Sequence, residues 1–170
     1  IFANSIIIFG IISNLLLIYR FETVQLPNRT AFIFLSIDII QLSLLLYLTG
    51  GVLNPFSIFL IIPSVFASSN LDIKSNLTLI FFTIISIFTL TFFHESLPSP
   101  LNEFKVNDYY FFSIPISLVI ALIFLNYFAL IFGKESRLRK EALDKINEVI
   151  AKEHELVSLG GQAAAAAHSL

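Results

Sequence analysis

The sequence predicts an all-α membrane protein, a polytopic bundle of transmembrane helices followed by a charged helical segment. Hydrophobic residues make up 56% of the 170-residue chain and charged residues only 13%, whereas a soluble domain carries about 25% charge. The mean hydropathy is +0.87. The apolar residues also form long continuous runs instead of alternating with polar ones, which favours spanning helices over barrel strands.

Five apolar runs are separated by polar loops, and we interpret each run as one span. They cover residues 2–19, 31–49, 56–69, 77–93 and 109–132. The third run is short and contains Pro63. We expect a sixth span before Ile1, because the chain contains no Met and an odd number of spans would place Ile1 on the outer side. Residues 1–132 are therefore predicted to be a transmembrane sensor bundle.

Lysine and arginine set the predicted orientation of this bundle. If the spans alternate in direction, Lys105 lies on one side of the membrane. The other basic residues considered lie on the opposite side: Arg20, Arg29, Lys74, Lys134, Arg137, Arg139 and Lys140. The second side is predicted to be cytoplasmic. The C-terminal segment then lies in the cytoplasm, and the loops at 50–55 and 94–108 face outward.

Residues 133–159 form a charged segment with a helical pattern. Its apolar residues recur at spacings of three, four and seven, at Leu143, Ile146, Ile150 and Val157. Such spacing is typical of a coiled-coil-like seam, although Glu153 interrupts it. We interpret the segment as a cytoplasmic signalling helix that dimerises. The alternative is a solvated amphipathic helix without a partner.

A few polar residues stand out among the spans. A charged residue such as Asp38 is energetically costly inside a membrane, so its presence there indicates a function. Gln41 lies on the same helix face and could pair with it. A hydrogen bond that only stabilises the bundle is the alternative for this pair and for Asn126. His94, at the outer interface, could exchange protons with a ligand or simply be solvated. The chain has no Cys and only three His, without metal-ligand spacing, so no metal site is predicted.

Two short stretches carry the functional signal. In the loop Gly50-Gly51-Val52-Leu53-Asn54-Pro55-Phe56, two glycines end a helix and Asn-Pro opens a turn. By itself this is a turn between two helices. The stretch 158–170 is rich in alanine, which favours a helix, and contains His168 after the weak point Gly160-Gly161. By itself this is a helix with an incidental histidine.

Both stretches resemble the RegB/PrrB (ActS-like) family of redox-responsive membrane sensor histidine kinases. The loop matches the family's GGxxNPF heptapeptide at every fixed position. Leu-Gly-Gly-Gln-Ala-Ala-Ala-Ala-Ala-His-Ser-Leu at residues 159–170 resembles the phosphoacceptor box, which continues in the family with Gly-Thr-Pro-Leu. Residues 46–49 and 38–41 also resemble the family. Residues 160–170 are therefore expected to be the truncated start of a dimerisation and histidine phosphotransfer domain.

The resemblance implies a sensor histidine kinase of a two-component system in the bacterial inner membrane. It would sense the quinone pool, autophosphorylate on His168 and pass the phosphate to a response regulator. Ubiquinone would bind at Gly50, Gly51, Asn54, Pro55 and Phe56, with the Asn54 amide as a donor and Phe56 as a stacking face. ATP and Mg²⁺ would bind only to a downstream domain, without which this chain is inactive. Ser169 departs from the acidic residue that many such kinases place after the histidine.

The expected partners are a second copy of the chain in a homodimer, the response regulator, membrane lipid and quinone, with no direct contact to nucleic acid. Two other classes of protein compete with the kinase interpretation. A transporter or channel fragment would show intramembrane charge pairs and broken repeats, but only Asp38 is a charged residue well inside a span. A non-catalytic membrane anchor with a dimerising helix would not bind quinone.

Overall fold

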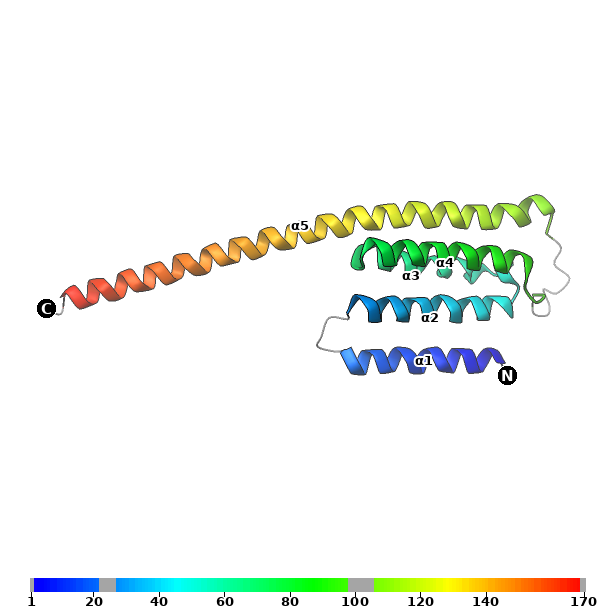
Figure 1. Cartoon of the computed structure of the whole chain (residues 1–170), viewed down its shortest axis with the longest axis horizontal. Coiled ribbons are helices and arrows are strands. Elements are labelled where there is room, and N and C mark those ends of the chain that lie inside the picture. Colours follow the sequence, from blue (N-terminus) through cyan, green and yellow to red (C-terminus); the bar gives the residue numbers. More distant parts are fainter. Residues whose placement is uncertain (1, 22–26, 98–105, 169–170) are drawn as a thin grey trace. The chain divides into compact units, whose positions relative to one another are not determined.

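The structure, a computed structural model, describes residues 2–21, 27–97 and 106–168, and the side chains of residues 3–19, 27–97 and 106–159. The elements in these ranges are helices, which confirms the predicted all-α class (Figure 1). In chain order they are α1 (Phe2–Phe21), α2 (Asn28–Tyr47), the 3₁₀ helices η1 (Gly51–Leu53) and η2 (Pro55–Ile61), α3 (Ile62–Asn70), α4 (Ile73–Phe92) and α5 (Asp108–His168).

The chain divides into two compact units, Ile1–Ile131 and Phe132–Leu170. In the first unit α2 packs against α1, α3 and α4, and α3 also packs against α4. Figure 1 shows α1 running alongside α2 in this unit. The first part of α5 completes the unit, with Leu118 and Leu122 in its buried core. The second unit consists of the remainder of α5.

Within the described part of the chain, three helices are long and apolar enough to cross a membrane: α2, α4 and the apolar part of α5. Two of the five predicted spans are shorter apolar helices, at Ala3–Tyr19 and Pro55–Asn70. The second of these begins as a 3₁₀ helix, which rises about 2.0 Å per residue against 1.5 Å in an α-helix. Its seven 3₁₀ and nine α-helical residues therefore reach about 27 Å, close to the roughly 30 Å hydrocarbon core.

Two helices begin earlier than the sequence analysis predicted. Helix α2 already includes Asn28 and Arg29, and α4 starts at Ile73, so most of the expected loop at 70–76 is helical. The Asp72 carboxylate caps α4 by accepting hydrogen bonds from Ser75 Oγ (2.8 Å) and Ser75 N–H (3.1 Å). These bonds lower the pKa of Asp72. Hydropathy misses a capped polar first turn because that turn carries no apolar signal.

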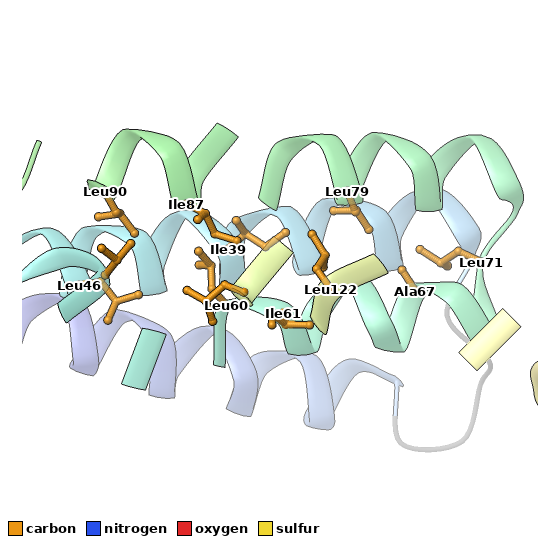
Figure 2. Close-up of a cluster of buried hydrophobic side chains, with 12 residues drawn as sticks. Ile39, Leu46, Leu60, Ile61, Ala67, Leu71, Leu79, Ile87, Leu90 and Leu122 are labelled. Carbon is orange, nitrogen blue, oxygen red and sulfur yellow. The ribbon is translucent and has the colours of Figure 1, made fainter. Parts of the chain in front are cut away.

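The core of the first unit is a line of aliphatic side chains between the helices (Figure 2). Ile39 of α2 and both Leu79 and Ile87 of α4 are fully buried, as is Leu122 of α5. Leu60 and Ile61 of η2 join the same cluster. The 3₁₀ segment is thus part of the packed core. A change in the packing of η2 would therefore alter the packing of α2, α4 and α5 together.

In the second unit, residues 134–159 are all exposed. The predicted seam residues Leu143, Ile146, Ile150 and Val157 are 45–68% exposed. Glu135 pairs with Arg139 at 2.6 Å and Glu148 with Lys152 at 2.7 Å, each across one helical turn. Such exposed pairs stabilise a helix by only about 0.3–0.5 kcal/mol each. The helix continues without a break through Gly160 and Gly161.

Candidate functional site: the loop Gly50–Phe56 and its neighbours

The two glycines fit the loop tightly onto the end of α4. Gly50 has φ of 104° and Gly51 has φ of 60°, a left-handed conformation that favours glycine. A Cβ on Gly51 would lie 2.5 Å from the Leu90 carbonyl oxygen and 2.7 Å from His94 Cβ, and one on Gly50 would lie 2.4 Å from Leu97 Cδ2. Gly51 therefore needs glycine for both conformation and space, whereas Gly50, whose near neighbour is the flexible Leu97 side chain, needs it for its conformation.

The amide of Asn54 holds the loop together. Its Nδ2 donates to the carbonyl oxygen of Thr49 (3.1 Å) and to Thr49 Oγ1 (2.7 Å), while its Oδ1 accepts from the Phe56 N–H (2.9 Å). Asn54 is also the N-cap of η2. From the sequence we expected this amide to donate to a ligand. In the structure both amide hydrogens are already used within the loop, so a ligand could bind them only by replacing Thr49.

Pro55 and Phe56 form the exposed part of the motif. Pro55 is the first residue of η2, a position where the missing N–H costs nothing. The Phe56 side chain is 60% exposed, and its ring centroid lies 5.7 Å from that of Phe59. Phe56 is therefore the motif residue whose side chain is most available to an apolar ligand or to lipid.

His94 lies directly against the loop. Its Cβ and Cγ are the atoms that a side chain at position 51 would meet, and its ring centroid lies 6.4 Å from that of Phe111 in α5. The Nδ1 atom is buried and has no hydrogen-bond partner in the described part of the chain. Of the two alternatives for His94, simple solvation does not fit this buried Nδ1, and proton exchange with a ligand stays a prediction. The sequence indicated only that His94 and the loop share one side of the membrane.

Asp38 and Gln41 line a pocket of about 300 Å³ together with Asn14, Phe59 and Pro63. Among the described residues, no hydrogen bond joins Asp38 to Gln41, so their expected pairing is not found. Gln41 instead packs against α1, where a Cβ on Gly10 would lie 1.8 Å from Gln41 Nε2. The lack of a side chain at Gly10 lets α1 pass close to this amide.

Asn126 belongs to a buried polar cluster that the sequence analysis did not assemble. Its Nδ2 donates to Ser64 Oγ (3.3 Å) and to the Leu122 carbonyl (2.8 Å). Ser68 Oγ is in hydrogen-bond contact with Oδ1 of Asn126 and, at 3.1 Å, with Oδ1 of Asn76. All four polar side chains are buried. This arrangement fits the bundle-stabilising alternative for Asn126 and places Asn76 inside the bundle instead of in a loop.

His168 is the last residue of α5, and its side chain lies outside the described residues, as do Ser169 and Leu170. Among the side chains that are described, no group of three or more His, Cys, Asp and Glu residues could hold a metal ion. The loop Gly50–Phe56 and the predicted phosphoacceptor belong to different units of the chain. The described site is therefore the loop with His94.

Comparison with known proteins identifies a relative. The chain is 32% identical over 168 residues to "Sensor histidine kinase RegB" of Cereibacter sphaeroides, and the alignment covers 95% of this chain and 35% of RegB. This chain is RegB-like. The resemblance inferred from two short motifs thus extends along nearly the whole sequence. No family model and no solved structure match it.

The RegB-like chain spans about a third of the length of the curated relative it matches. Its apolar helices and this similarity together support a membrane protein. The assignment of site residues in the loop, and of His168, rests on the resemblance of the two motifs to the family. The structure adds their surroundings: Gly51 packs on the end of α4, Gly50 lies against Leu97, Asn54 holds the turn, and Phe56 is exposed.

Proposed function

We propose that this chain is the membrane part of a sensor histidine kinase that responds to the redox state of the membrane quinone pool. The observation that supports the kinase class is the 32% identity to RegB along 95% of the chain. The GGxxNPF loop and the alanine-rich box around His168 support the finer assignment, because each matches the family at the positions that define the motif.

The proposed input is ubiquinone bound near the loop Gly50–Phe56. A ligand there would act on the packing between the loop and the end of α4, where Gly51 contacts Leu90 and His94. From the loop, η2 leads into α3, and Ser64 and Ser68 of α3 bond to Asn126 of α5. A shift between two packing arrangements of these helices is a physical route from ligand to α5.

The proposed output is phosphorylation of His168. An imidazole nitrogen of His168 attacks the γ-phosphorus of ATP, the bond to the β–γ bridging oxygen breaks, and ADP leaves. ATP and Mg²⁺ would be held by the catalytic domain of the kinase. The phosphate would then pass to an aspartate of a response regulator. Helix α5 connects the bundle to His168 without interruption.

The output assignment is tested by phosphorylation with labelled ATP. A histidine-kinase catalytic domain is fused after Leu170 or supplied separately, and acid-labile phosphate on the chain is measured. His168→Ala should abolish the label, whereas His154→Ala, a change of the nearby exposed histidine, should retain it. Label that survives His168→Ala would remove the kinase assignment.

The input assignment is tested by titrating ubiquinone into the chain held in nanodiscs. Phe56→Ala should weaken binding about fivefold, because stacking on an aromatic ring is worth roughly 1 kcal/mol. Leu53→Ala, at a variable position of the same motif, should bind like the wild type. A wild-type chain that does not bind quinone would favour the alternative of a plain membrane anchor.

We also propose that the chain works as a homodimer in the bacterial inner membrane, with its C-terminus in the cytoplasm. The exposed row Leu143, Ile146 and Ile150 supports the dimer, because it presents an apolar seam on an otherwise charged helix. A cysteine at Ile146 should cross-link two copies in membranes more readily than a cysteine at Lys145, which lies off the seam. Equal cross-linking at both positions would contradict this interface.

A further inference from the structure

A groove between α2 and α4 lies next to the glycines of the loop and has a volume of about 280 Å³. Its walls are mostly apolar, with Tyr47 and Phe82 as the aromatic members, and are formed by Ile40, Ser43, Leu44, Tyr47, Phe82, Ile85, Ser86, Thr89 and Leu90. The Leu90 carbonyl is the atom that approaches Gly51. The groove therefore begins where the loop packs onto α4.

Two hydroxyl groups in this groove have no hydrogen bond within the described part of the chain, those of Ser86 and Thr89. Their neighbours on α4 behave differently: Thr83 Oγ1 donates to the Leu79 carbonyl (2.9 Å) and Thr91 Oγ1 to the Ile87 carbonyl (2.8 Å). Ser43, on the opposite wall, donates to the Ile39 carbonyl. Bonding of this kind is the usual way for a hydroxyl in a membrane helix to avoid the cost of being unpaired.

The position of these two unbonded hydroxyls suggests a binding role. The Ser86 side chain is only 8% exposed, whereas Thr89 is exposed at the surface of the bundle, so a ligand in the groove can reach both hydroxyls. Residues 86 and 89 are three apart on one helix and face the same side, with their Cβ atoms about 5–6 Å apart. An apolar groove with a few convergent polar groups is the usual form of a small-molecule site. The groove thus offers two donors, side by side, on an apolar wall.

The chemistry of the walls selects the kind of ligand. A plain hydrocarbon chain would leave both hydroxyls unpaired, and a charged headgroup would find no charged residue among those that line the groove. A flat ring with two opposed carbonyl oxygens can lie along α4 and accept from both hydroxyls. A cavity of about 150 Å³ already binds benzene, so 280 Å³ accommodates a substituted ring whose apolar tail extends into lipid.

We propose that Ser86 and Thr89 donate hydrogen bonds to the carbonyl oxygens of a quinone whose ring lies between α2 and α4. This inference rests on the proposed function for the class of ligand, and it places the ring beside the loop instead of on the Asn54 amide. The loop then has a positioning role. The close approach of Gly51 to the Leu90 carbonyl fixes the end of the groove. The hydrogen bond from the Glu95 N–H to the Tyr47 carbonyl (2.8 Å) also holds this end.

The test is a titration of the 170-residue chain in phosphatidylcholine nanodiscs with ubiquinone-1. Ser86→Ala and Thr89→Val should each weaken binding roughly fivefold, and the double variant more than tenfold, since each removes one neutral hydrogen bond. Thr83→Val is the matched control, because its hydroxyl is bonded to its own helix, and it should bind like the wild type. Ile85→Trp, which fills the groove, should abolish binding. Circular dichroism melting checks that every variant is folded.

The possible outcomes separate this inference from the proposed function. A wild-type chain that does not bind ubiquinone-1 overturns both. Binding that is lost in Phe56→Ala but unchanged in the Ser86/Thr89 double variant overturns the groove and keeps the loop as the site. Binding lost only in Ile85→Trp means that the groove holds the tail, and the assignment of the ring is wrong. Cross-linking of a cysteine at Ile85 to a second copy would show that protein covers the groove, which also overturns the assignment.

Discussion

Gly51 illustrates, at the scale of single residues, how one position can meet two independent requirements. Its φ of 60° lies in the left-handed region, and its α-carbon approaches the Leu90 carbonyl and His94 so closely that no side chain fits between them. The first requirement comes from the turn, and the second comes from the end of α4. A residue that satisfied only the turn would still push the loop off the helix.

We therefore expect Gly51→Ala to destabilise the chain more than any change in the variable part of the motif. The left-handed conformation alone costs alanine about 1–2 kcal/mol, and the contact with the Leu90 carbonyl adds to that cost. The measurement is thermal unfolding followed by circular dichroism in detergent. Leu53→Ala, which keeps the glycines and Asn54, is the control and should melt close to the wild type. Equal melting temperatures for Gly51→Ala and the wild type would show that the loop does not pack on α4.

At the scale of elements, three helices of the bundle are joined through Asn126 and Ser68. Asn126 of α5 bonds to Ser64 of α3 and contacts Ser68, and Ser68 also contacts Asn76 of α4. Ser64 in turn donates to the carbonyl of Ile61, the last residue of η2 (3.0 Å). The 3₁₀ segment, α3, α4 and α5 are thus joined by one continuous set of buried polar contacts. Such a set couples the packing of these helices to one another.

Removing the amide should loosen this junction. Asn126→Leu keeps the approximate volume but leaves Ser64 without one partner and Ser68 without another. Hydrogen bonds between membrane helices are worth about 0.6 kcal/mol on average, so we expect a loss of about 1 kcal/mol in the free energy of unfolding. Denaturation by sodium dodecyl sulfate in mixed micelles measures this change. Asn70→Ala, which removes two exposed bonds, to the Phe66 carbonyl and to Ser69 Oγ, should change stability far less; equal losses would contradict the structural role of Asn126.

At the scale of the whole molecule, the two ends of α4 belong to different sides of the membrane in the predicted orientation. The loop glycines pack near the end of α4, at Leu90, whereas Asp72 caps its start and Lys74 lies in its first turn. The orientation itself, which the basic residues indicate, stays a prediction. Spans that cross in alternate directions would place the Gly50–Phe56 loop outside, and the charged part of α5 inside.

Reporter fusions test this orientation. Fusions within 71–75 and after Gly133 should report the cytoplasm, because the basic residues concentrate there. Fusions within 101–107 should report the periplasm. The opposite response at any one of the three sites would contradict the topology, and it would also move the proposed quinone site to the other face of the membrane.

The sequence by itself determined the class of the molecule, because hydropathy and charge are summed over consecutive residues and need no tertiary contact. The long apolar runs predicted the all-α membrane bundle, and the motifs around Asn54 and His168 indicated the RegB-like resemblance. It also located the breaks at Gly50 and Pro55. The start of α4 was missed, since a helix capped by Asp72 opens with polar residues that look like a loop.

Only the tertiary structure decided how the polar side chains are paired. The amide of Asn54 bonds within its own loop, Asn76 is buried beside Asn126, and His94 lies against Gly51. The hydroxyls of Ser86 and Thr89 lack the bonds that Thr83 and Thr91 make. A hydrogen bond depends on the position and direction of two groups that can be far apart in sequence, and a pattern along the chain does not contain that information.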